Sequence, residues 1–449
     1  MINKKWIGFR FSILLAATFL LVNRSSGQSL YTLQQCIDTS LKNSLQLKSD
    51  NLDLDKTKAS IGEAYSSLLP TVSASGSYQY QFKVPVQLVP GELFGGTAGT
   101  YQVAQFSVPQ TKSGSLDLSQ TLFNASSLIA LKAAKVAVNL NQLQIQSSKE
   151  DLVYNVSATY YNIQTIMKQM EMTSRNLQNT EELLQSTSDQ YKAGLATETD
   201  VDRLNVSRDN SRADLESERN SLEKQYNLLK YLMNVPLESN IVIPDIDQAG
   251  TIVPAETPAF DITKKTDYLQ VLENRRVAEL ERKNIKAGYL PSLTLSANYG
   301  VSGYYSNADP FKNLNDKWYS SSYIKLALNV PIFDGFNKKY RIQSKSVEIK
   351  KYDVQAEQLR QQSLKNVANA NADLKSNFLT LQNKRRSLDL AQKVLDDLQL
   401  QYQNGIAKIT DVINSQTDLH TAQNNYINAL INIKQAELDL KKAQGTLLN

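Results

Sequence analysis

The chain contains two copies of a similar segment. The residues YKAGLATETDV at 191–201 return as YQNGIAKITDV at 402–412, so that Gly405 follows Gly194 by 211 residues. Two earlier pairs keep the same order: LLPTVSASGSY at 68–78 returns as YLPSLTLSANY at 289–299, and LSQTLFNA at 118–125 as LNVPIFDG at 328–335. Each half is therefore expected to hold a helix, a strand, a loop, a strand, a long helix, a glycine turn and a second long helix. A repeated set of elements favours a ring or tube over one catalytic pocket.

The repeats also set the expected domain boundaries. Residues 28–235 form the first repeat and residues 263–449 the second, and they end in long helical hairpins over 124–235 and 334–449 respectively. Residues 236–262 connect the two and hold four of the 11 prolines, which indicates a non-helical segment. We expect one interleaved domain built from both repeats.

Residues 1–27 have the layout of a secretory signal peptide. Three basic residues precede an apolar run from Phe11 to Val22, and small residues follow up to Gly27. We expect cleavage near Gly27. An uncleaved membrane anchor is the alternative, but this run of 12 residues is shorter than the roughly 20 that a helix needs to cross a bilayer.

Charge and cysteine content exclude two classes of protein. Removal of the expected signal peptide leaves 45 Lys and Arg against 44 Asp and Glu, so the remaining chain is almost neutral and no nucleic-acid partner is expected. Cys36 is the only cysteine, which excludes a disulfide within the chain.

Two stretches free of glycine and proline predict very long helices. They run from Ala125 to Tyr191 and from Phe336 to Gln403, with apolar residues at helical spacing. Shorter return helices are expected over 199–235 and 410–448. At 1.5 Å per residue the long helices reach roughly 100 Å. Because one globular core cannot cover such helices, we expect them to pack on each other as a coiled-coil layer.

Four segments alternate between apolar and polar residues and predict strands over 71–83, 113–123, 291–303 and 321–333. In the first, the apolar or aromatic set is Val72, Ala74, Gly76, Tyr78, Tyr80 and Phe82, and the residues between them are polar. Long loops are expected over 84–112 and 304–320, away from the helices. In a secreted protein this pattern is typical of an outer-membrane barrel with a polar lumen, and the strands are long enough to cross a bilayer. Two hairpins of a soluble β-sandwich are the alternative.

Four strands cannot close a barrel alone. Barrels that cross a bilayer are closed and have about eight strands or more, so several copies of the chain must share one. The sequence therefore predicts a mainly α protein with a β-barrel portion to which each chain gives four strands, continued by a tube of long helices.

At this point the chain resembles the TolC-type outer-membrane efflux proteins. The resemblance rests on YTLQQCIDTSLKNSLQLK at 31–48, the LLP and YLP strand entries, VPIFDG at 330–335, the TDV after each glycine turn, and QGTL at 444–447. It implies a homotrimer in the outer membrane of a diderm bacterium, in contact with outer-membrane lipid. A periplasmic α-helical barrel would continue the β-barrel, with an equatorial girdle formed by residues 236–262 and the C-terminal end. The partners implied are a periplasmic adaptor (membrane fusion) protein and an inner-membrane pump.

The resemblance also implies a periplasmic gate. Asp411 matches an aspartate that lines the aperture, and Tyr402 and Asp200 match positions that hold the closed state. The second aperture aspartate is replaced by Asn414, and Ala407 stands where an arginine is expected, with Lys408 beside it. Either Lys408 substitutes or the closed state is looser. The alternative for the two aspartates is that they cap the first turns of their helices.

The glycine turns are the expected contact site for the adaptor. Gly194 and Leu195 lie at the first turn, and Gly405 and Ile406 at the second. No phosphate-binding loop, dinucleotide fingerprint or cysteine and histidine cluster occurs, so neither a cofactor nor an enzymatic activity is expected. The only histidine, His420, is expected to have no functional role.

These observations predict a passive exit duct of a tripartite efflux pump for small toxic compounds. Two alternatives remain: an outer-membrane component of type I protein secretion, and a non-conducting periplasmic coiled-coil protein that its hairpins anchor.

Overall fold

The computed structural model describes residues 29–245, 260–306 and 317–448. The expected signal peptide, the central part of the expected connection 236–262 and most of the expected loop 304–320 lie outside the described residues. The chain divides into two compact units: Met1–Ser49, Ile145–Asp267 and Leu359–Asn449 form unit 1, and Asp50–Gln144 and Tyr268–Gln358 form unit 2. Each unit draws on both repeats, because α4 (Ala125–Lys192) and α7 (Asn337–Gln403) each begin in unit 2 and end in unit 1.

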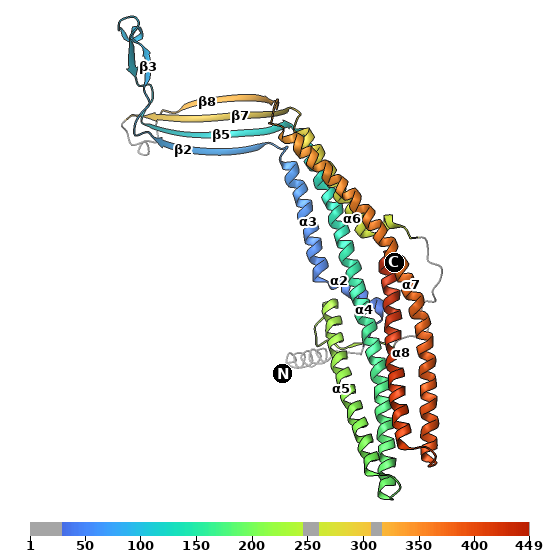
Figure 1. The fold of residues 1–449 in the computed structure, drawn as a ribbon. Coiled ribbons are helices and arrows are strands. Elements are labelled where there is room, and N and C mark those ends of the chain that lie inside the picture. The colour runs from blue at the N-terminus through green and yellow to red at the C-terminus, as the bar shows by residue number, and fades with distance from the viewer. Residues whose placement is uncertain (1–28, 246–259, 307–316, 449) are drawn as a thin grey trace, which may run out of the picture. The chain divides into compact units, whose positions relative to one another are not determined.

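Unit 2 contains a four-stranded antiparallel sheet of order β2-β5-β7-β8 (Figure 1). The strands are β2 (Thr71–Tyr80), β5 (Gln110–Phe123), β7 (Ser292–Tyr305) and β8 (Tyr319–Asn329). Helices α3 (Leu45–Ser66) and α6 (Thr266–Ala287) precede β2 and β7. Among the described strands, β2 pairs only with β5 and β8 only with β7, so the sheet is open at both edges.

The strand ends differ from the sequence prediction. Strand β8 ends at Asn329, whereas the alternation predicts residues up to 333. Pro331 explains this end, because proline has no N–H to give to a β-ladder. Strand β5 begins at Gln110 and β2 ends at Tyr80, where the two strands pair with each other.

The segment 84–112, predicted as a loop, contains a second sheet. Strand β3 (Gln87–Pro90) pairs antiparallel with β4 (Tyr101–Ala104), and a 3₁₀ turn, η1 (Gly91–Phe94), follows β3. Alternation alone does not reveal these strands, because they are short and proline and glycine residues lie close to them in the sequence.

Unit 1 consists mainly of helices. It contains α2 (Leu33–Asn43), α5 (Glu198–Met233), α8 (Ile409–Gln444) and the C-terminal parts of α4 and α7. A short 3₁₀ helix, η3 (Ile262–Lys264), precedes α6. Strand β1 (Ser29–Leu30) pairs in parallel with β6 (Ile241–Val242), which lies in the described part of the connection.

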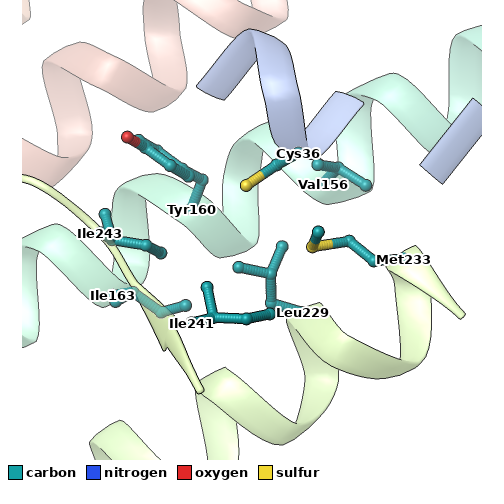
Figure 2. Packing of buried hydrophobic residues seen from close by; sticks show 8 residues of the cluster. All are labelled: Cys36, Val156, Tyr160, Ile163, Leu229, Met233, Ile241 and Ile243. Carbon is teal, nitrogen blue, oxygen red and sulfur yellow. The ribbon is translucent and has the colours of Figure 1, made fainter. Parts of the chain in front are cut away.

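A core in unit 1 holds the start of the chain against the end of the first helical hairpin. Eight buried residues from α2, α4, α5, β6 and the residue that follows β6 form it: Cys36, Val156, Tyr160, Ile163, Leu229, Met233, Ile241 and Ile243 (Figure 2). Burial raises the pKa of the Cys36 thiol to about 12. The thiol is therefore protonated at neutral pH and behaves as a small apolar group.

A second core in unit 1 joins all four long helices near their turns. Leu204 of α5, Leu395 of α7 and Val412 of α8 are buried in it, and Leu183 and Leu184 of α4 pack against it. Among the described residues, no helix combines the length and the apolar character needed to cross a membrane.

Candidate functional site: the helical turns and the polar face of the sheet

The two glycine turns have the same hydrogen bonds. In the first, the Leu195 N–H donates to the Gln190 carbonyl (2.8 Å) and the Gly194 N–H to the Tyr191 carbonyl (2.9 Å). In the second, the N–H groups of Ile406 and Gly405 make the equivalent bonds, both 2.9 Å. Both glycines have a left-handed backbone, with φ of +74° and +73°. This is the Schellman end of a helix, which favours glycine because it has no Cβ.

The residues predicted to contact an adaptor lie on the surface. Leu195 is 80% exposed and Ile406 is 76% exposed. Each directly follows its glycine, so that one large apolar side chain is displayed at each turn. Exposed apolar residues fixed on tight turns are suited to binding another protein.

Asp200 is engaged in the cap of α5. Its carboxylate accepts hydrogen bonds from the Thr197 N–H (3.2 Å) and from the Thr197 hydroxyl (2.7 Å). The Thr197 hydroxyl oxygen in turn accepts from the Asp200 N–H (3.3 Å). These contacts form a capping box and confirm the alternative interpretation of Asp200 as a carboxylate of the first helical turn.

Asp411 has a weaker local role. It accepts from the Lys408 N–H (3.3 Å), but a lysine side chain has no acceptor with which to complete the box. Asp411 is exposed, so its carboxylate can also meet ions in solution.

Tyr402 links the two helical hairpins. Its hydroxyl donates to Gln190 Oε1 (2.9 Å) and lies 3.2 Å from the hydroxyl of Thr187, both on α4. Its ring packs against the core shared by the four helices. Of the three predicted gate residues, Tyr402 alone makes a side-chain hydrogen bond to the other hairpin within the described residues.

Sequence reasoning missed the partners of Tyr402 on α4. Thr187 belongs to a row of buried threonines, Thr173, Thr180 and Thr187, which are spaced by seven residues and are 4%, 3% and 0% exposed. Residues spaced by seven on a coiled-coil helix share one face, but polar residues at this spacing also occur on solvent-exposed faces, so the sequence alone does not identify Thr187 as buried.

A buried carboxylate of α5 contacts the same row. The Thr173 hydroxyl donates to Glu218 Oε1 of α5 (2.9 Å), and Glu218 is 8% exposed. Burial raises the pKa of this carboxyl, and the Thr173 hydrogen bond lowers it by less. Asn176 and Gln423 form a further polar link, from α4 to α8, through two hydrogen bonds between their side-chain amides (2.5 and 3.2 Å).

One face of the sheet is lined by hydroxyl and amide groups. Serine hydroxyls pair across β2 and β5, at 2.9 Å for Ser75 and Ser115 and at 2.7 Å for Ser77 and Ser113. Asp117 accepts from Ser115 (2.7 Å) and from the Asn298 amide of β7 (2.7 Å). Asp117 and Lys325 are the only Asp, Glu, Lys or Arg residues on this face of the four strands.

The opposite face of the sheet is apolar and exposed. The register aligns Val72, Leu118, Ala297 and Ile324 in one row across the four strands. Val72 is 69% exposed and Ile324 81%. At the end of this face Lys112 Nζ lies 5.1 Å from the ring centre of Tyr305 and 5.7 Å from that of Trp318. A polar face opposite an apolar, aromatic-edged face is the pattern of a strand set in a lipid-facing wall.

No group of three or more metal-binding side chains occurs in the part of the chain that the structure describes. His420 Nε2 lies 3.5 Å from the Asn424 amide one turn later.

Comparison with known proteins places this geometry in a family. Residues 36–235 and 269–446 match the family model described as outer membrane efflux protein. The chain is 22% identical to the outer membrane protein TolC of Escherichia coli K12, over 90% of this chain and 80% of that protein. It is 24% identical to the probable efflux pump outer membrane protein TtgC of Pseudomonas putida, over 92% of this chain and 82% of that protein. The solved structure of CusC has the same fold, with a TM-score of 0.73 at 17% identity, over 92% of this chain and 91% of that one.

Proposed function

The chain belongs to the outer membrane efflux protein family, and on this premise we propose that three copies of it form one passive exit duct for a tripartite efflux pump. The family is one of outer-membrane channels and not a class of enzymes, and the chain is accordingly a protein of the outer membrane. No catalytic step is part of the proposal.

The observation that carries the proposal is the open, two-faced sheet. In hydrocarbon, each backbone N–H or C=O group without a hydrogen bond costs several kcal/mol. The outer edges of β2 and β8 are open among the described strands, so a membrane-embedded sheet of this kind needs other copies to close it. Closure with the serine-rich face inward gives a polar lumen and an apolar, lipid-facing wall.

The helical hairpins supply the rest of the duct. Helices α4 and α7 have 68 and 67 residues, and α5 and α8 have 36 residues each. The matched hydrogen bonds of their turns support an origin by duplication. We propose that the hairpins of three copies form the wall of the periplasmic tube.

The gate is proposed to lie at the helical turns. The hydrogen bonds from Tyr402 to α4 support a role as a latch that holds the two hairpins together. A ring of Asp411 carboxylates, one from each copy, would attract cations at the aperture. Asp200 would act mainly by fixing the start of α5.

The partners are proposed from the exposed turns and from the names of the relatives. Leu195 and Ile406 are the residues proposed to contact a periplasmic adaptor, which would connect the duct to an inner-membrane pump. TtgC is named as part of an efflux pump, and for this chain we propose small toxic compounds as the cargo. The duct itself supplies no energy.

Planar-bilayer conductance of the purified protein tests the proposed function. We expect small, cation-selective currents from the intact chain and a reduced preference for cations in Asp411→Asn. Glu198→Gln is the matched control, because it removes an exposed carboxylate at the first turn of α5. The absence of any current from inserted protein, with or without the substitutions, would contradict the duct.

A further inference from the structure

The hairpin that joins β2 to β5 has a defined conformation, held by hydrogen bonds. We call residues Gln87–Ala104 the apical hairpin. The Gly91 N–H donates to the Thr100 carbonyl (2.8 Å), the Gly96 N–H to the Gly91 carbonyl (2.8 Å), and the Gly99 N–H to Glu92 Oε1 (3.1 Å). A Cβ on Gly91 would collide with Thr100. These bonds give the hairpin a defined shape and a defined pair of faces.

One face of the apical hairpin is apolar and exposed. The register places Leu88 opposite Val103 and Pro90 opposite Tyr101 on this face, whereas Gln87, Val89, Gln102 and Ala104 lie on the other. Leu88, Val103 and Tyr101 are 69%, 66% and 71% exposed. The 3₁₀ turn that follows adds Leu93 and Phe94, which are also exposed. An exposed apolar surface of this kind marks an interaction site.

The apical hairpin has little to stabilise it as an isolated element in water. Strands β3 and β4 pair only with each other among the described strands, and an isolated two-stranded hairpin is marginally stable at best. Glu92 is the only charged residue between Lys83 and Lys112, so the hairpin lacks the charges that normally protect an exposed edge. A partner that covers the apolar face would stabilise the hairpin by burying these side chains.

The position of the hairpin favours other copies of the same chain as that partner. Strand β2 begins directly after α3, and the hairpin follows the far end of β2, beyond the sheet (Figure 1). Strand β2 is also an edge strand, so in the proposed trimer the hairpin leaves the sheet where two copies meet. Three identical apolar faces are then held close together at an effective concentration of roughly millimolar. A single carboxylate per hairpin, already bonded to Gly99, offers little like-charge repulsion.

We propose that the apolar faces of the three apical hairpins pack against each other and cover the outer mouth of the duct. The proposal rests on the trimeric duct proposed above. One apical hairpin covers only part of the mouth, so the cover is incomplete without the neighbouring copies. The proposal assigns the apical hairpin a role in closing the extracellular end, separate from the periplasmic gate.

Cysteine cross-linking with a matched pair of positions tests the cover. Val103→Cys places a thiol on the apolar face, and Gln102→Cys places one on the opposite face of the same strand. Cys36 is buried and its thiol is protonated at neutral pH, so the wild-type chain serves as the unreactive control. With a short bifunctional maleimide on the purified protein, we expect linked pairs of chains from Val103→Cys and at least ten times fewer from Gln102→Cys.

Two results would overturn the cover while leaving the trimer intact. In protein that migrates as a trimer on a native gel, the first is that Val103→Cys fails to cross-link. The second is that Val103→Cys and Gln102→Cys cross-link equally. Protein that does not form trimers would instead refute the proposed function, and the cover with it.

A second measurement follows the opening of the cover. Val103→Glu introduces three carboxylates that repel each other, and Gln102→Glu introduces the same charge on the opposite face. We expect external protease to cut the hairpin several-fold faster in inserted trimers of Val103→Glu than in those of Gln102→Glu. Equal rates of cutting would refute the packed faces.

Discussion

Removing the hydroxyl of Tyr402 is the sharpest perturbation of the proposed latch. Tyr402→Phe leaves the ring in the core of the four helices but deletes its hydrogen bonds to Thr187 and Gln190 of α4. Each neutral hydrogen bond contributes about 0.5–1.5 kcal/mol. The loss therefore favours separation of the two hairpins by about 1–3 kcal/mol per copy.

A free energy of this size shifts the equilibrium between closed and open hairpins roughly 5- to 150-fold per copy. The assay is single-channel recording of the purified protein in planar bilayers, where we expect longer open times and larger mean currents from Tyr402→Phe. Tyr191→Phe is the matched control, since Tyr191 occupies the equivalent position in the first turn and is 44% exposed. Unchanged gating in Tyr402→Phe, or an equal effect of Tyr191→Phe, would refute the latch.

Three further predictions concern the turns, a buried acid and the lumen. Gly405→Ala forces a side chain into a left-handed backbone and should lower the free energy of unfolding by about 1 kcal/mol, measured by thermal unfolding. Gly62→Ala, in open space on α3, should raise it by a similar amount. Equal effects of the two substitutions would contradict the prediction. The raised pKa of Glu218 means that the folded chain holds this proton more tightly than the unfolded chain, so the stability that the protonated carboxyl contributes is present below about pH 4.5 and is lost as pH rises through the raised pKa. Glu218→Gln should therefore be more stable than wild type at pH 7 but not at pH 4. A gain in stability that does not depend on pH, or an equal gain from the exposed Glu223→Gln, would contradict this prediction. Asp117→Asn should lower the preference for cations several-fold and Lys325→Met should raise it, because both residues lie on the proposed lumen face; shifts of the same sign in both variants would exclude that face as the lumen.

The strands of the large sheet could be predicted because their chemistry is local. Alternation along 71–83 identifies which residues share a face, and β2 keeps that alternation over Thr71–Tyr80. The end of β8 was missed because apolar residues continue to Phe333, although Pro331 cannot join the ladder. The apical hairpin was missed because strands of four residues give too few alternations to stand out from a loop.

The glycine turns of the candidate site could be predicted from the sequence, but the side-chain contacts around them could not. Each glycine, followed by TDV, identifies a turn, and the left-handed backbone of Gly194 and Gly405 explains why glycine stands there. The link from Tyr402 to Thr187 joins residues 215 positions apart in the chain, and no local pattern around Tyr402 contains it. The role of Asp200 in the cap could be read from Thr197 three residues earlier, which is the spacing of a capping box.

The central claim is that three copies of this chain close one duct, and counting the chains in the native complex tests it most directly. Native mass spectrometry of the protein, released from outer membranes in mild detergent, should give three chains per particle, and heating should convert these particles into single chains. A particle of one or two chains that still conducts ions would contradict the account.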